Sequence, residues 1–193
     1  MNAITQIITQ QLGGSAARTI AQRLGVSETT ANTAVQIAVP LIVAALARNA
    51  SQPQEAQNLH QAVATDHDGS ILDNVMGYLQ NPQTSNGSGI LGHVFGNERP
   101  AIESSLAQAT GMDQNAAGGL LETLAPLVMG SLGKAQQENG LDASGLSNLL
   151  NHQQQEAQAS APGAMGMLNS ILDQNKDGSS MDDLQRMAAS FFK

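Results

Sequence analysis

The residues best suited to chemistry form a short acidic loop near the end of the chain. Asp173, Asn175 and Asp177 alternate along the sequence, and a Gly-Ser pair follows them directly. This pattern matches the first half of an EF-hand-type loop, in which oxygens at alternating positions bind Ca²⁺ and glycine permits the sharp bend. The second half departs from that pattern, because Leu184 stands where an EF-hand has its closing glutamate. The oxygen ligands predicted for calcium belong to Asp173, Asn175, Asp177, Ser179, Asp182 and Asp183.

A second Asp-Gly-Ser sequence lies in the first half of the chain and supplies a weaker ligand set. Ala64 occupies the place of the first ligand. The oxygens that remain belong to Asp66, Asp68, Ser70 and Asp73. Both loops also have an ion-free explanation, because Ser70 and Ser179 are each followed three residues later by an acid, the pattern of a helix-capping box. Calcium binding and helix capping are therefore the two alternatives for each loop.

The sequence lacks the usual catalytic motifs. It has no cysteine, no Gly-x-Ser-x-Gly sequence and no phosphate-binding loop, and its four histidines lack the helical pairing of zinc proteases. Residues 87–92 spell Gly-x-Gly-x-x-Gly, but they follow a polar loop and no strand, so the dinucleotide-binding context is missing. We therefore expect a non-enzymatic protein with no cofactor other than calcium.

An internal repeat indicates how the chain positions these loops. Residues 20–48 align without a gap to residues 106–134, and the glycines Gly25 and Gly111 coincide. Ser27 and Asp113, two residues further on in each copy, are both good helix N-caps. Each copy therefore predicts a first helix, a left-handed glycine turn and a second, longer helix. Pro40 and Pro126 fall inside the longer helices, where we expect a kink or a break.

The two Asp-Gly-Ser loops match each other at a larger spacing, so the second copy contains an insertion. We predict a first repeat unit over residues 1–82 and a second over residues 83–193. The insertion is placed near residues 136–162, a Gln- and Ala-rich stretch interpreted as partly a linker.

The composition predicts an all-α protein. Aromatic residues make up 2% of the chain and tryptophan is absent, so the core must consist of Ala, Leu, Ile, Val and Met. These residues suit closely packed helices better than sheets, and no stretch alternates with period two as a strand would.

The first helix–turn–helix resembles a bacterial DNA-binding motif, but its charge does not fit DNA. Its second helix would present Glu28, Thr29 and Thr33 and no lysine or arginine, and the net charge of the chain is −8. Binding to a duplex normally needs several cations facing the phosphates. A structural helix corner is therefore favoured over a nucleic-acid interface.

The sequence also predicts neither a targeting segment nor a membrane span. Its start lacks the charged and apolar regions of a signal peptide. The most apolar run, residues 37–47, is about half the length of a membrane-spanning helix. A cytoplasmic location is the expectation that follows.

Three segments together resemble the bacterial YidB-like family of uncharacterised proteins. They are residues 89–96 (GILGHVFG), residues 124–130 (LAPLVMG) and the Asp-x-Asn-x-Asp-Gly-Ser tail. The resemblance implies an orthogonal array of helices with homeodomain-like corners, and it implies no established activity.

Four functions are compatible with these features. The two less favoured are nucleic-acid binding through the helix corners, against which the charge argues, and a hydrolase whose catalytic residues come together only in the fold. Two are favoured. The first is a helical interaction protein whose Asp-Gly-Ser loops bind Ca²⁺. The second is an ion-free scaffold that binds a protein partner, or a second copy of itself, in grooves near Pro40 and Pro126.

Overall fold

The computed structural model describes residues 15–82, 85–160, 163 and 166, and these residues form helices and no strand, which confirms the all-α prediction. The α-helices are α2 (Ser15–Leu24), α3 (Glu28–Asn49), α4 (Pro53–Asp66), α5 (Val75–Gln80), α6 (Gly87–Phe95), α7 (Arg99–Thr110), α8 (Gln114–Asn139) and α9 (Ala143–Ser160). Two short 3-10 helices, η1 (Ser70–Asn74) and η3 (Gly96–Glu98), connect α4 to α5 and α6 to α7.

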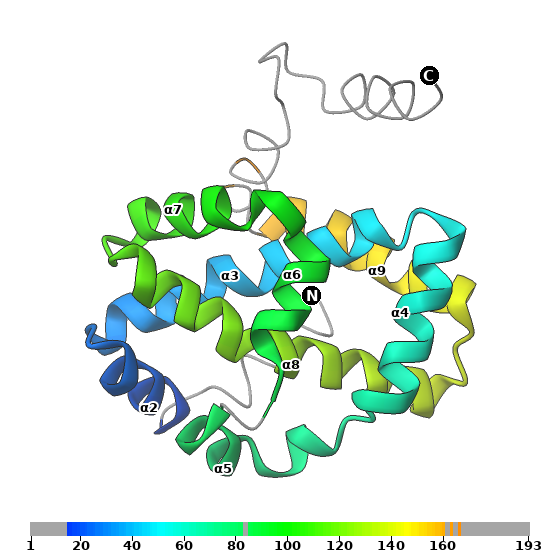
Figure 1. The fold of residues 1–193 in the computed structure, drawn as a ribbon, viewed down its shortest axis with the longest axis horizontal. Helices are drawn as coiled ribbons and strands as arrows, with labels where there is room; N and C mark the ends of the chain where they lie inside the picture. The colour runs from blue at the N-terminus through cyan, green and yellow to red at the C-terminus, as the bar shows by residue number, and fades with distance from the viewer. Residues whose placement is uncertain (1–14, 83–84, 161–162, 164–165, 167–193) are drawn as a thin grey trace.

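The long helices α3 and α8 run through the middle of the molecule, and the shorter helices surround them (Figure 1). Residues 38–47 of α3 and 123–133 of α8 are buried without interruption, as expected for helices covered on all sides. Both predicted repeat units contribute to the same hydrophobic cluster, for example Leu41 and Ile42 from the first and Leu124 and Val128 from the second. The described residues therefore share one core.

Both predicted helix corners are present, with the predicted local chemistry. Gly25 and Gly111 have φ values of 67° and 71°, in the left-handed region that glycine adopts without strain. The Ser27 hydroxyl accepts a hydrogen bond from the Thr30 N–H at 3.0 Å, and Asp113 caps α8 through the same kind of bond. The common origin of the two corners and their likeness to homeodomains stay predictions.

Of the kink or break predicted at both prolines, the break is wrong, and the kink stays a prediction. Helix α3 continues for nine residues beyond Pro40, and α8 continues for thirteen residues beyond Pro126. A proline removes one backbone hydrogen bond from a helix. Both prolines lie in the buried middle of their helices, where packing on all sides stabilises the helix independently of that bond.

The interpretation of the polar insertion as a linker is wrong for residues 143–160. This stretch forms α9, which packs against α3 and α4. Leu146, Leu150, Gln153 and Ala157 are all buried, and their spacing places them on one face of the helix. Because a glutamine occupies the third position of that face, the apolar pattern is interrupted in the sequence.

Helices α3 and α8 are long and apolar enough to cross a membrane by length and composition alone. The apolar window is thus longer than the run of residues 37–47 indicated. The shares of these windows that are buried inside the fold are 72% and 89%, which favours core helices over membrane spans.

Candidate functional site

The first Asp-Gly-Ser loop lies directly on α8, where two glycines allow it to approach. A Cβ atom at Gly133 would overlap the backbone carbonyl of His67, and one at Gly130 would overlap the side chain of Ile71. Gly69 is itself buried, with φ at +95°, and a Cβ there would lie 3.0 Å from the Cβ of Lys134. The loop and the small-residue face of α8 therefore fit together through backbone contact.

The capping box predicted at Ser70 does not form. The helix that begins there is a 3-10 turn, η1, whose N-cap is Gly69 without a side-chain hydrogen bond. The Asp68 Oδ1 atom instead accepts the Ser70 N–H at 3.0 Å, and hydrogen bonding by Ser70 lowers the pKa of Asp68. The true cap lies four residues later, where Asn74 Oδ1 accepts the Gly77 N–H at 2.9 Å and begins α5. Asp-Gly at this position therefore forms an Asx turn.

The predicted ligands of the first loop do not gather around one point. Asp66 is the last residue of α4, Asp68 follows in the loop, and Asp73 lies in η1. Across the described part of the chain, no three His, Asp or Glu side chains are placed to hold a metal ion together. The stronger predicted set, residues 173–183, lies outside the described residues.

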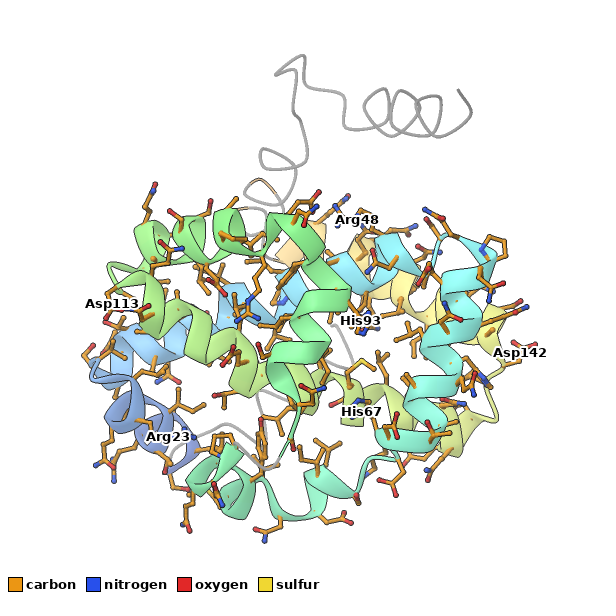
Figure 2. The ribbon with its side chains drawn as sticks, viewed as in Figure 1. Arg23, Arg48, His67, His93, Asp113 and Asp142 are labelled. Carbon is orange, nitrogen blue, oxygen red and sulfur yellow. The ribbon has the colours of Figure 1, made fainter. Side chains whose placement is uncertain are left out.

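The same loop closes one end of a groove of about 880 Å³. Helix α4 lines one side of the groove and α6 the other, while α8 and the end of α3 contribute residues between them (Figure 1). His67 and His93 lie beside the groove, between α6 and α4 (Figure 2). Its apolar lining comes from Leu46, Leu59, Ala62, Ile71, Ile90, Val94, Pro126 and Met129.

The charged lining of the groove is acidic. Glu55, Asp66 and Asp68 contribute carboxylates, and neither lysine nor arginine is among the lining residues. Burial lowers the pKa of His67, against the opposing effect of the nearby Asp66 carboxylate, and so favours the neutral imidazole.

Side-chain hydrogen bonds hold both ends of helix α6, which forms one side of the groove. The Asn86 side chain caps its beginning by accepting the Gly89 N–H at 3.0 Å. At its other end, Asn49 of α3 donates to the carbonyls of His93 and Val94 at 3.2 and 3.1 Å. The absence of a Cβ at Gly87 lets α6 lie against the Glu122 carbonyl of α8.

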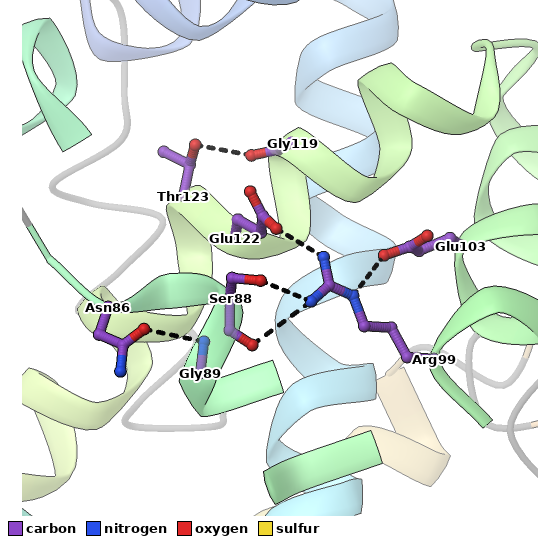
Figure 3. A network of polar contacts seen from close by, with 8 residues as sticks. All are labelled: Asn86, Ser88, Gly89, Arg99, Glu103, Gly119, Glu122 and Thr123. Atoms are coloured by element: carbon purple, nitrogen blue, oxygen red, sulfur yellow. Dashed lines mark hydrogen bonds and ion pairs between the residues drawn. The ribbon is translucent and has the colours of Figure 1, made fainter. Parts of the chain in front are cut away.

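Arg99 forms a polar network with Ser88, Glu103 and Glu122 beside α6, called the Arg99 clamp below (Figure 3). The Arg99 guanidinium forms ion pairs with Glu103 at 2.6 Å and with Glu122 at 2.5 Å. It also donates to the Ser88 hydroxyl at 2.9 Å, which links α6, α7 and α8. Hydrogen bonding to Glu103 raises the pKa of Arg99. These contacts stabilise the position of α6 and leave the carboxylates of the clamp already paired.

Helix α4 is attached differently. Only Ala56 and Val63 of its fourteen residues are buried, and they belong to the face that packs towards the rest of the fold. The His60 Nε2 atom lies 3.2 Å from the carbonyl of Leu141, in the turn between α8 and α9. The face of α4 towards the groove carries Leu59 and Ala62, which are half-buried.

A known protein family is similar to this chain over most of its length. A family model described as a bacterial protein of unknown function (DUF937) matches residues 6–136. The chain belongs to the DUF937 family. The match spans both helix corners and the whole groove, whereas α9 and the C-terminal Asp-Gly-Ser loop lie beyond it. No curated protein and no solved structure matches the chain.

The groove of this DUF937 protein was only partly foreseen from its sequence. The sequence predicts grooves near Pro40 and Pro126; Pro126 lines this groove, whereas Pro40 is buried in α3 and is not among its lining residues. Glu55, Leu59 and Ile90 were missed, because they come from helices far apart in the sequence. The sequence offers one signal, the helical spacing of Glu55, Leu59, Ala62 and Asp66. The same spacing also occurs on helix faces that simply contact solvent, so it indicates a groove only when the opposite helix is known.

Proposed function

We propose that this protein is a non-enzymatic interaction protein that binds a helical segment of a partner protein in the groove between α4 and α6. The observation that carries the proposal is the groove itself, with a lining of mixed apolar and polar residues, two flanking helices and a volume of about 880 Å³. Helix-in-groove binding is a common recognition mode, in which an amphipathic helix lays its apolar face between neighbouring helices. The dimensions of α4, with fourteen residues, suit a partner helix of three to four turns.

The side chains of the groove favour apolar contact with a partner. Ile90 on α6 and Met129 on α8 line the groove but are already buried in the core. Leu59, Ala62 and Ile71 also line it and are half-buried, so they keep apolar surface exposed to water. A partner helix that covers these side chains removes apolar surface from water, which is the main favourable term in such association.

The two helices that flank the groove, α6 and α4, differ in how they are held in the fold. Helix α6 is held by Asn49, Asn86 and the Arg99 clamp, so binding need not order it. Helix α4 buries only Ala56 and Val63, so its groove side is left exposed for contact with a partner.

Photocrosslinking in the native bacterial cell tests this proposal. A photoreactive amino acid replaces Ala62, which lines the groove, and in a control protein it replaces Ala109, which is exposed on α7. We expect a discrete crosslinked protein from position 62 and none above background from position 109. Equal patterns from the two positions would show that the groove receives no specific partner. Mass spectrometry of the product distinguishes another protein from a second copy of this chain.

Calcium binding at Asp173–Asp183 is the second candidate function, supported by the Asp-x-Asn-x-Asp-Gly-Ser sequence. Calorimetric titration of the chelator-treated full chain with CaCl₂ is expected to release heat and raise the melting temperature. Asp177→Ala is expected to abolish both effects, because a ligand specific to the folded state must stabilise it. The absence of heat and stabilisation at millimolar Ca²⁺ would remove this candidate without touching the first.

Several finer relationships are also proposals. We propose that the chain is YidB-like, that residues 1–82 and 83–193 arose by duplication, and that the protein is cytoplasmic. The matching glycine turns and N-caps of the two corners support the duplication. A nucleic-acid role is disfavoured, since the exposed start of α3 carries Glu28, and Arg18 lies 3.5 Å from that carboxylate.

A further inference from the structure

We propose that the groove selects a cationic amphipathic helix, with basic residues about eleven positions apart and apolar residues between them. This inference rests on the proposed function and specifies the chemistry of the partner. It comes from the order of side chains along the groove face of α4.

Four residues of α4 that line the groove follow one helical face. Glu55, Leu59, Ala62 and Asp66 stand at positions i, i+4, i+7 and i+11, so they lie in a row along the axis. The row reads acidic, apolar, apolar, acidic. At roughly 1.5 Å per residue, the two carboxylates are about 16 Å apart along the helix. A helix lying alongside α4 matches this row with two cations at the same separation and apolar residues in the middle.

These carboxylates are available for a partner's cations. Glu55 and Asp66 are exposed, and the ion pairs among the described residues involve neither of them. Asp68 adds a third negative charge at the loop end of the groove. The lining contains no lysine or arginine, and the net charge of the whole chain is −8. Charges of one sign in a groove attract a partner of the opposite sign and repel one of the same sign.

The apolar part of the groove makes a soluble polycation a poor match. Leu59 and Ala62, both half-buried, give the row between the two carboxylates an apolar character that lysine head groups alone do not satisfy. The partner must therefore present both properties on one face, as an amphipathic helix does.

Two synthetic peptides test, on the full-length protein, the prediction that the groove binds a cationic helix better than an anionic one. This prediction is called the charge rule below. The probe is a 14-residue Ala- and Gln-based helical peptide, with lysines eleven positions apart and leucines four and seven positions after the first lysine. The control peptide is identical except that glutamates replace the lysines. Binding is measured by fluorescence polarisation at low ionic strength, where exposed charges are least screened. We expect the lysine peptide to bind about tenfold or more tightly than the glutamate peptide, since the two lysines gain and the two glutamates lose ion-pair energy.

Substitutions in the protein test whether the acidic residues of α4 cause the preference for the lysine peptide. Glu55→Gln and Asp66→Asn are each expected to weaken binding of the lysine peptide about two- to fivefold, the range of an exposed ion pair. Glu138→Gln removes the same charge from an exposed position outside the groove lining and is expected to leave binding within error. Leu59→Lys removes apolar contact from the middle of the α4 row and adds a charge of the peptide's own sign, so it is expected to abolish binding of the lysine peptide.

The outcomes separate this inference from the function on which it rests. Equal affinities for the two peptides, or binding unaffected by Glu55→Gln and Asp66→Asn, would overturn the charge rule. Binding that survives Leu59→Lys would overturn it as well, because the peptide would then occupy another surface. If neither peptide binds while position 62 still crosslinks a partner in cells, the charge rule is wrong and the groove remains a protein-binding site. If position 62 crosslinks nothing, the proposed function fails.

Discussion

Replacing Gly133 by alanine is expected to destabilise the protein, although alanine is the better helix former. Within a helix, a change from glycine to alanine normally contributes up to about 1 kcal/mol of stability. At Gly133 the added Cβ would overlap the carbonyl oxygen of His67. That oxygen is a backbone atom and cannot rotate away, so the cost lies near the upper end of the range for overpacking, about 3 kcal/mol. The net loss is then about 2 kcal/mol, or about 4–8 °C in melting temperature for a chain of this size.

The same helix offers a matched control at Gly119. A Cβ there would meet only the end of the Leu24 side chain, at 3.3 Å, which is flexible and able to move. Gly119→Ala is therefore expected to leave stability unchanged or to raise the melting temperature by a few degrees, about 2–4 °C. Urea unfolding followed by circular dichroism measures both variants, and the comparison is valid where the slope of the transition is unchanged.

This pair of variants tests the contact between the first Asp-Gly-Ser loop and α8. If Gly133→Ala proved as stable as Gly119→Ala, the loop would not lie against α8 as described, and the loop end of the groove would be wrong. A loss at Gly133 with no loss at Gly119 would confirm that the small-residue face positions the loop.

Further predictions concern the clamp, the buried tyrosine and the last helix. Arg99→Lys is expected to cost about 1–3 kcal/mol in urea unfolding, because an ammonium cannot reproduce the planar fork that reaches its two glutamates and a serine; equal stability would contradict the clamp. Tyr78→Phe is expected to cost about 1 kcal/mol, since the Tyr78 hydroxyl donates to the Thr123 carbonyl at 2.9 Å inside the core. Burial raises the pKa of Tyr78, so its contribution is complete below the unfolded value of about 10 and is lost as pH rises above it. Stability that does not fall above about pH 10, or that falls equally in Tyr78→Phe, would refute this. Leu150→Ala is expected to cost about 2–5 kcal/mol if α9 belongs to the core, whereas exposed Asn148→Ala is expected to cost little; equal effects would return this segment to a linker.

Local chemistry explains the parts of the fold that the sequence predicted correctly. Gly25 and Gly111 need a left-handed conformation, and Ser27 and Asp113 satisfy N–H groups within their own first turn. Such signals act over a few residues, so they are readable without knowing the rest of the structure.

The failures have the opposite cause, because each depends on distant residues. Pro40 stays inside α3 because the surrounding helices bury the segment on both sides of it. Ser70 loses its predicted capping role because the loop must approach Gly130 and Gly133, which fixes Gly69 in a left-handed turn. Neither outcome is encoded in the nearby sequence.

The groove, too, depends on residues that are distant in the sequence, so the sequence alone does not predict it. Its residues come from the helices α3, α4, α6 and α8, from η1, and from the segments before η1 and α6, and the pattern from Glu55 to Asp66 gains meaning only when α6 and α8 are seen to lie opposite. The sequence identifies the oxygen-rich loops as the most conspicuous chemistry. The structure adds that the first of these loops lies against α8 at one end of a groove with acidic lining residues.

The most direct test of this account is the identity of the segment that crosslinks to position 62 in cells. We expect one discrete partner segment, with an amphipathic helical pattern and basic residues flanking its apolar face. We expect that segment to be lost when Leu59 is replaced by lysine, which removes apolar contact and adds a charge of the partner's own sign. Crosslinks spread over many unrelated proteins, matching those from position 109, or unaffected by Leu59→Lys, would contradict the claim that the groove is a binding site.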